Sequence, residues 1–428
     1  MKKLIALVLC MLMILTCFVG CAEETEAPAT EVTTETAERP YEGQELNVWT
    51  GYVEGTPTWE AANEYIAKFE EMTGAKVNVS HYGTDLSTML ITALGAGEEV
   101  DIFPMSHVTL GNNQEYTLDL TERIENSDVV DRTYPVLFDI MREYSPDDTL
   151  RGIPTQSSFQ AFWYNKAAFE AAGITENPET LEEFEAVCDA LVAAGYYPMA
   201  LDSSYTLITF GALVERMVGE DAVNDMVMNG GFAENEDFVA ACQKLIDWRA
   251  KGYFEPNAPG EWPASQNKIG LTEEVAMVYC GMWVSGEIEE MTGADLEWGS
   301  FKFPYDPNGN GTYGMTVSCS VNCINANIAP GKEDMAWDYL RYMNTGEANK
   351  AITDADVYLV DDRTMEPLPQ FVDGQHIMET TTETTTYHGG LHANADIKVS
   401  IGEVVVALCS GQFATGEEAA AAFDALVA

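Results

Sequence analysis

Residues 151–174 read RGIPTQSSFQAFWYNKAAFEAAGI. A polar run, Thr155 to Ser158, passes into an apolar and aromatic strand, Phe159 to Tyr164, and a helical stretch then ends at Gly173. Polar side chains on a half-buried strand need partners, because an unpaired buried amide or hydroxyl costs roughly 1–3 kcal/mol. We therefore expect protein groups, water or a ligand to meet the side chains of the polar run.

The N-terminus has the pattern of a secretory signal over residues 1–20, with a basic start and an apolar run from Leu4. This run of about 13–16 residues is shorter than the roughly 20 that a membrane span needs. Phe18-Val19-Gly20-Cys21 resembles a bacterial lipobox, which predicts lipidation of Cys21, although leucine is commonest where Phe18 stands. An ordinary signal peptide with a coincidental cysteine is the alternative. Residues 21–44 are rich in Glu, Thr, Ala and Pro, and this composition predicts a disordered tether.

The composition argues against several function classes. A net charge of −49, with 70 acidic and 21 basic residues, disfavours binding to nucleic acid and broad contact with an anionic membrane. The mature part of about 400 residues is longer than one hydrophobic core usually grows, so we expect two lobes. The mature cysteines are widely scattered, and we expect Cys319 and Cys323 to pack in a core rather than to bind metal.

Strand and helix patterns alternate through the mature chain. This order predicts an α/β fold with parallel strands and right-handed crossovers, in which ligands bind at the carboxyl ends of strands. The capping-box pattern of Thr180 and Glu183 predicts a further helix start. The first segments are a strand over 46–49, a helix over 57–72, a strand over 75–79, a helix over 85–94 and a strand over 100–103.

These motifs resemble, in order and over nearly the whole mature chain, the family 1 extracellular solute-binding proteins of bacterial sugar ABC transporters, the relatives of maltose-binding protein. The most specific match is Trp163-Tyr164-Asn165-Lys166 followed by Thr180-Leu181-Glu182-Glu183-Phe184, in which Leu181 replaces the usual tryptophan. Further matches are Leu46 to Trp49, Phe69 to Gly74, Ala96 to Ile102, Gly152 to Pro154, Ala172-Gly173, Gly281 to Trp283 and Ala336 to Leu340.

The resemblance implies a two-lobed periplasmic-binding-protein-like fold of class II. Each lobe would be a mostly parallel sheet flanked by helices, with the ligand cleft between the lobes. The first lobe would comprise residues 45–152 with 314–352, and the second lobe residues 153–313 with 353–428. The chain would cross between the lobes near 152–157, 303–313 and 353–358. The polar run would then lie beside the cleft, where sugar hydroxyls or bridging water supply its partners.

A sugar has polar edges and apolar C–H faces, so its site needs aromatic rings together with carboxylates and amides. Trp283 is the strongest candidate for stacking, because it follows the expected strand over 275–279 and matches the family's tryptophan turn. For Trp49, packing in the core is as good an interpretation as contact with the ligand. Glu54 could accept two sugar hydroxyls or be an ordinary surface acid. The expected ligand-binding residues are Trp49, Tyr52, Glu54, His81, Tyr82, Ser106, Gln156, Ser157, Asp202, Tyr205 and Trp283.

No motif indicates catalysis or a cofactor. The chain has no G-x-S-x-G and no phosphate-binding loop, although counting alone does not exclude a glycosidase pair among 70 acids. His388 and His392 have the spacing of zinc ligands on a helix, but the two glycines between them favour a loop. We therefore expect no catalytic residue, no metal and no cofactor.

The sequence as a whole predicts a monomeric, lipid-anchored substrate-binding protein on the outer face of the cytoplasmic membrane, as in Gram-positive bacteria. It would bind a carbohydrate, best an oligosaccharide, and deliver it to the permease subunits of an ABC importer. A ligand that bridges both lobes favours the closed state, which the permease recognises. A non-sugar solute such as a polyamine is the alternative within the family, and a secreted glycan-degrading enzyme is the alternative from another class.

Overall fold

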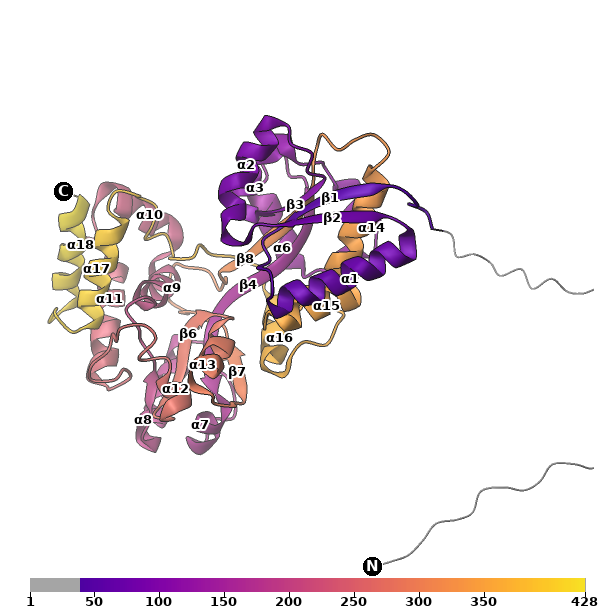
Figure 1. Cartoon of the computed structure of the whole chain (residues 1–428). Helices are drawn as coiled ribbons and strands as arrows, with labels where there is room; N and C mark the ends of the chain where they lie inside the picture. The colour runs from indigo at the N-terminus through magenta and orange to yellow at the C-terminus, as the bar shows by residue number, and fades with distance from the viewer. Residues whose placement is uncertain (1–38, 428) are drawn as a thin grey trace, which may run out of the picture. The chain divides into compact units, whose positions relative to one another are not determined.

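The computed structural model of the chain describes residues 39–427, so the expected signal and Cys21 lie outside the described residues. Within them, one sheet has the strand order β2-β1-β3-β8-β4-β6-β5, and β7 pairs with β4 off this path (Figure 1). The strands are β1 (Glu45–Thr50), β2 (Lys76–His81), β3 (Ile102–Ser106), β4 (Gly152–Asn165), β5 (Tyr197–Met199), β6 (Val275–Gly281), β7 (Trp298–Phe301) and β8 (Val317–Ile324).

The first lobe is built on β1, β2 and β3, which run parallel as the sequence predicts. β8 returns from the second lobe and pairs antiparallel with β3. Helix α1 begins where the Thr56 hydroxyl accepts the N–H of Trp59, and it ends at Gly74, whose positive φ of 78° suits glycine. The helices of this lobe are α1 (Pro57–Thr73), η1 (Gly83–Asp85), α2 (Leu86–Ala96), α3 (His107–Leu110), η2 (Gly111–Tyr116), α4 (Thr121–Glu125), α5 (Val129–Arg132), α6 (Pro135–Glu143), α14 (Glu333–Asn344) and α15 (Gly346–Ala355).

The second lobe differs from the expected mostly parallel sheet. β4 runs antiparallel to both β6 and β7, and only β5 and β6 are parallel. The reason is that β4 is a single 14-residue strand that pairs with β8 at one end and with β6 and β7 at the other. Periodicity predicts a strand, but the connections decide the direction of its neighbours.

Helices cover the second lobe, and their apolar faces form a core with the aromatic side of β4. The predicted capping box is present, because Thr180 and Glu183 each accept a backbone N–H of the other. α11, α17 and α18 contact one another at the C-terminal end of the chain (Figure 1). The helices are α7 (Lys166–Ala171), α8 (Leu181–Ala194), α9 (Thr206–Val218), α10 (Glu220–Asn229), α11 (Glu236–Ala250), α12 (Lys268–Leu271), α13 (Val284–Thr292), η3 (Pro369–Phe371), α16 (Val372–Thr380), α17 (Lys398–Cys409) and α18 (Gly416–Val427).

The chain between β8 and α16 packs against the first lobe for longer than we expected. α14 and α15 contact α1, and the rings of Phe69 and Tyr339 meet edge to face at 5.3 Å. Asp362, which we expected in the second lobe, accepts a hydrogen bond from Arg132 at 2.8 Å. Val360 likewise accepts one from the Tyr134 hydroxyl at 3.2 Å. The predicted boundary at residue 353 is therefore too early, because a buried carboxylate stays with the lobe that supplies its donors.

Two minor sequence expectations can be compared directly with the fold. Cys319 and Cys323 are buried and unpaired on one face of β8, which confirms core packing. His388 and His392 lie in a turn rather than a helix, with their ring centroids 3.7 Å apart. Over residues 39–427, no helix combines the length and the hydropathy that a bilayer crossing requires.

Candidate ligand cleft

A cavity of about 410 Å³, here called the cleft cavity, opens where the strands of the first lobe end. Gly51 follows β1, Gly83 follows β2 and Ser106 ends β3, and all three line it. The carboxyl ends of parallel strands are the usual ligand position in such sheets, and the volume lies within the usual range of about 300–1,000 Å³. The other lining residues are Thr84, Leu86, Ser87, Leu90, Ile91, Pro104, Met105, Thr109, Asn113, Gln156 and Ser320.

A row of hydroxyl and amide side chains, here called the polar stripe, continues from the cleft cavity along β8 and β4. Ser106 lies opposite Ser320, and Ser158 lies opposite Ser318. Residues directly opposite each other point to the same face of a sheet, and so do residues two apart on one strand. Gln160 therefore follows Ser158 on that face. The polar stripe consists of Ser106, Ser318, Ser320, Ser158 and Gln160.

The buried end of the polar stripe is incompletely hydrogen-bonded. Gln160 is 3% exposed, and within the described part of the chain its amide nitrogen has no hydrogen-bond partner. The hydroxyl of the nearby Ser157, 1% exposed, also has none among residues 39–427. Each unsatisfied buried group costs about 1–3 kcal/mol, so a ligand or water that reaches it recovers part of that free energy.

An indole ring lies at this end of the polar stripe. Gly281 is directly opposite Gln160, and a Cβ atom added to Gly281 would collide with the indole of Trp283. The ring of Trp283 therefore covers the sheet face that carries Gln160. Trp283 and Tyr205 are each half-buried, and both pack against the hydrophobic cluster that extends along β4 and β6. The arrangement offers one apolar ring surface beside neutral hydrogen-bonding groups.

Several predicted residues of the first lobe lie near the strand ends but do not line the cleft cavity. Tyr52 is half-buried and Glu54 is exposed in the loop after β1. His81 and Tyr82, half-buried, follow along β2. The His81 ring bonds the Thr50 hydroxyl at 2.8 Å, and burial lowers the pKa of His81 although Glu54 opposes this. These four residues remain predictions, whereas Ser106 and Gln156 do line the cavity.

Two predicted ligand residues are structural instead. Trp49 is 7% exposed and packs against Tyr82, with 4.4 Å between the two ring centroids. Asp202 is fully buried, and its carboxylate accepts the backbone N–H groups of Ser265 at 2.8 Å and Gln266 at 2.9 Å. Burial raises the pKa of Asp202, and these hydrogen bonds oppose that shift. Both residues are corrected from ligand contact to support of the fold.

Sequence reasoning did not identify several residues that line the cleft cavity. Ser320, which lines it, and Ser318 of the polar stripe alternate with apolar residues along β8, so the strand pattern did contain a signal for one polar face. Leu86 and Leu90 have the spacing of an ordinary core face on α2, which carries no functional signal. Thr84 and Asn113 lie in 3₁₀ turns without a motif.

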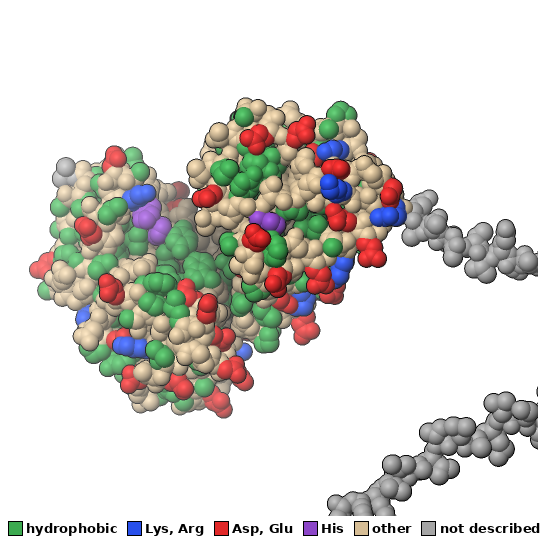
Figure 2. Space-filling view, in the orientation of Figure 1, with side chains coloured by type: hydrophobic (Ala, Val, Ile, Leu, Met, Phe, Trp, Pro, Cys, Tyr) green, Lys and Arg blue, Asp and Glu red, His purple; other side chains and the backbone are tan. Residues whose placement is uncertain are grey.

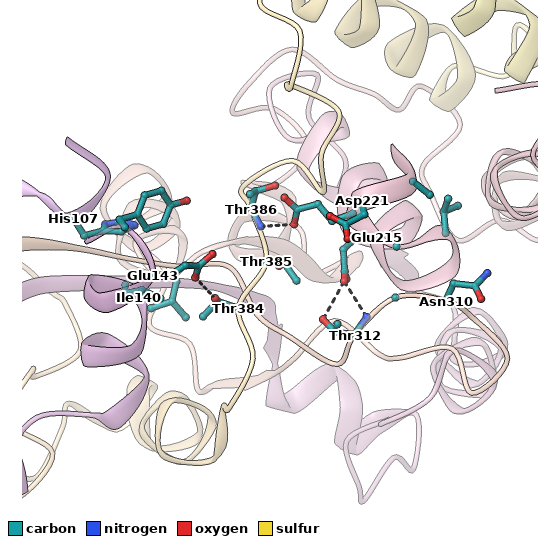
Figure 3. Close-up of a pocket in the computed structure, with 17 residues that line it drawn as sticks. His107, Ile140, Glu143, Glu215, Asp221, Asn310, Thr312, Thr384, Thr385 and Thr386 are labelled. Atoms are coloured by element: carbon teal, nitrogen blue, oxygen red, sulfur yellow. Dashed lines mark hydrogen bonds between the residues drawn. The ribbon is translucent and has the colours of Figure 1, made fainter. Parts of the chain in front are cut away.

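A larger cavity of about 500 Å³, here called the hinge cavity, is lined by residues of both lobes and of the crossover segments (Figure 3). Val317 lines it, and Val317 points to the face of β8 opposite Ser318 and Ser320. Its carboxylates bind the crossovers. The Glu143 carboxylate accepts a hydrogen bond from the Thr384 hydroxyl at 3.3 Å, and the Glu220 carboxylate accepts one from the Thr386 N–H at 3.1 Å. The Glu215 carboxylate accepts hydrogen bonds from both the N–H and the hydroxyl of Thr312 at 3.1 Å.

The hinge cavity therefore consists mainly of groups that hold the crossovers in place. His107, which follows the predicted Ser106, belongs to this face and bonds the Cys319 carbonyl at 3.1 Å, and burial lowers the pKa of His107. The strand ends, the unpartnered amide and the half-buried indole favour the cleft cavity with the polar stripe as the ligand site. Among the described residues, no three His, Cys, Asp or Glu side chains gather as a metal ion would require.

The family model for bacterial extracellular solute-binding proteins matches residues 55–350. The chain belongs to this family. Three solved structures resemble this solute-binding protein. Apo RafE from Streptococcus pneumoniae has a TM-score of 0.67 at 17% identity, with 90% of this chain and 97% of that chain covered. A chitin oligosaccharide binding protein has a TM-score of 0.60 at 19% sequence identity, with 90% of this chain and 98% of that chain covered. A family 1 extracellular solute-binding protein from Bifidobacterium longum subsp. infantis has a TM-score of 0.63 at 17% sequence identity, with 90% of this chain and 99% of that chain covered.

At these identities the likeness concerns the fold, and it agrees with the two-lobed α/β architecture of this solute-binding protein. No curated protein sequence matches the chain. Figure 2 shows hydrophobic side chains gathered in the hollow of the visible face, while acidic side chains are spread over the outer surface.

Proposed function

We propose that this solute-binding protein binds a carbohydrate, best an oligosaccharide, in the cleft cavity and along the polar stripe. The observation that carries the proposal is the unpartnered Gln160 amide beside the half-buried indole of Trp283. A sugar ring matches this pair, because its C–H face packs on an indole while its hydroxyls bond amides and serines. The similarity in fold to a chitin oligosaccharide binding protein supports the same ligand class.

The family membership supports delivery of the sugar to the permease subunits of an ABC importer. Ligand groups that contact both Ser106 in the first lobe and Trp283 in the second would favour closure, and the permease would recognise the closed state. Lipidation of Cys21, in the segment outside the described residues, would hold the protein at the outer face of the membrane. No reaction is part of this proposal.

The cleft lining favours a sugar over the two alternatives. A polyamine needs carboxylates, and a glycosidase needs a pair of them. Over residues 39–427, no carboxylate lines the cleft cavity. Asp202 is the second-lobe acid among the predicted ligand residues, and its carboxylate is occupied by backbone donors.

A ligand screen with one variant tests the proposal. Thermal-shift and calorimetric measurements with oligosaccharides and with spermidine should show stabilisation by a sugar, about 2.7 kcal/mol at 100 times its dissociation constant. Gln160→Met removes the amide at similar length. It should leave the ligand-free protein as stable or more stable, because an unpartnered buried amide disappears, and it should weaken sugar binding. Stabilisation by spermidine alone, or unchanged sugar affinity of Gln160→Met, would contradict the proposal.

A further inference from the structure

The cleft cavity differs from the rest of the protein surface in charge. The chain has 70 acidic and 21 basic residues, yet within the described residues none of the cavity's lining side chains is ionisable. A charged group enclosed there would lose hydration without gaining a counter-charge, which is strongly unfavourable. The lining therefore favours an uncharged ligand group over a charged one.

One wall of the cleft cavity is aliphatic. Leu86 and Leu90 lie one turn apart on α2, Ile91 follows, and Met105 at the end of β3 is also part of the lining. Leu90 and Met105 are 3% and 6% exposed, whereas Ile91 is 36% exposed at the mouth. The described lining includes no aromatic ring, so this wall is suited to a compact alkyl group rather than to stacking on a pyranose face.

Amide and hydroxyl groups stand beside this aliphatic wall. Asn113 and Gln156 contribute amides, and Ser106 and Thr109 contribute hydroxyls. Building on the proposed function, we propose that the cleft cavity holds an uncharged sugar residue whose substituent ends in a methyl group. An acetamido group and the methyl of a 6-deoxy sugar share this chemistry. The methyl group contacts Leu86, Leu90 and Ile91, and the amides and hydroxyls bond the adjoining polar atoms.

A glycan array followed by calorimetry on matched pairs tests the inference. The glycans bound most tightly should carry an N-acetyl or 6-deoxy residue. One pair is the N-acetylglucosamine oligomer against the equal-length glucosamine and glucose oligomers, and the other is an L-fucose-terminated against an L-galactose-terminated oligosaccharide, which differ only by the hydroxyl on C6. Losing the methyl-bearing group, or adding a hydroxyl to it, should weaken binding about 10- to 200-fold, and the pair that shows this change identifies the substituent.

Ile91→Thr places a hydroxyl in the aliphatic wall at a partly exposed position, and Met89→Thr is the control on the same helix, 43% exposed and outside the cavity lining. Ile91→Thr should reduce the preference for the methyl-bearing sugar at least several-fold, and Met89→Thr should not. Tight binding of unsubstituted or charged glycans, or an unchanged preference in Ile91→Thr, would overturn this inference while leaving sugar binding intact. A protein that binds no glycan would instead overturn the proposed function.

Discussion

Replacing Trp283 by alanine should separate a ligand-stacking role from a folding role. Stacking of one ring on an aromatic side chain contributes about 1–3 kcal/mol, by analogy with stacked bases, so affinity should fall roughly 5- to 150-fold. A fully buried tryptophan would cost about 3–5 kcal/mol of stability on truncation. Trp283 is only half-buried, so Trp283→Ala should cost clearly less than that.

Gly281→Ala provides an independent perturbation of the same ring. The indole occupies the space that a Cβ atom at Gly281 would need, so alanine should displace the ring without removing it. Gly281 has no positive φ, and its backbone accepts alanine. Calorimetric affinity and the melting temperature should be measured on Gly281→Ala, Trp283→Ala and Trp283→Phe. The first two should bind weakly, and Trp283→Phe, which keeps a ring, should retain most of the affinity.

Two results would refute this reasoning. If Trp283→Ala and Gly281→Ala lose several kcal/mol of stability but bind sugar normally in the folded fraction, the indole belongs to the core. If Trp283→Ala binds weakly while Gly281→Ala binds normally, the ring does not act from its position over Gly281.

Three further predictions concern the buried Asp361 carboxylate, the pH dependence of stability and the membrane anchor. Asp361→Ala should lower the free energy of unfolding in urea by about 2–5 kcal/mol, because the buried carboxylate accepts from Gln156, Ser157 and Asn349, and an unchanged midpoint would contradict this. Burial, with His392 adding to it, lowers the pKa of His388 to about 4, so stability should fall as pH drops from about 6.5 to about 4. In His388→Asn this loss of stability should be smaller than in the wild type. An equal loss in both proteins would count against a lowered pKa of His388. Cys21→Ala should release the protein from membranes in fractionation, unlike the wild type.

The arrangement of strands and helices in the first lobe was predictable because each element carries a local signal. Thr56 and Gly74 mark the ends of α1, and β1, β2 and β3 are short apolar runs between helices. The directions in the second lobe were not predictable in this way. They depend on β4 pairing with β8, β6 and β7, and no property of residues 152–165 alone specifies those partners.

The site was predictable only where a residue's role follows from its place after a strand. Ser106, at the end of β3, lines the cleft cavity, as does Gln156, which lies within β4 and was expected near the cleft from the family resemblance. Trp49 also stands near a strand end, but its side chain is buried against Tyr82, which the position alone does not predict. Leu90 and Ile91 resemble core residues in sequence, because an apolar cavity wall and a core face have the same periodicity.

The backbone of the polar run in β4 has its hydrogen-bond partner far along the chain. Its backbone is held by Asp361, which lies about two hundred residues later and accepts the N–H groups of Gln156 at 2.9 Å and Ser157 at 2.8 Å. Gln156 adopts a φ of +47° there, within the register shift between Thr155 and Ser158. The shift sets which residues beyond it face Ser318, and so it places Ser158 and Gln160 on the side of Trp283. A buried carboxylate outside the cleft lining thus helps to fix which side chains of this strand face the polar stripe.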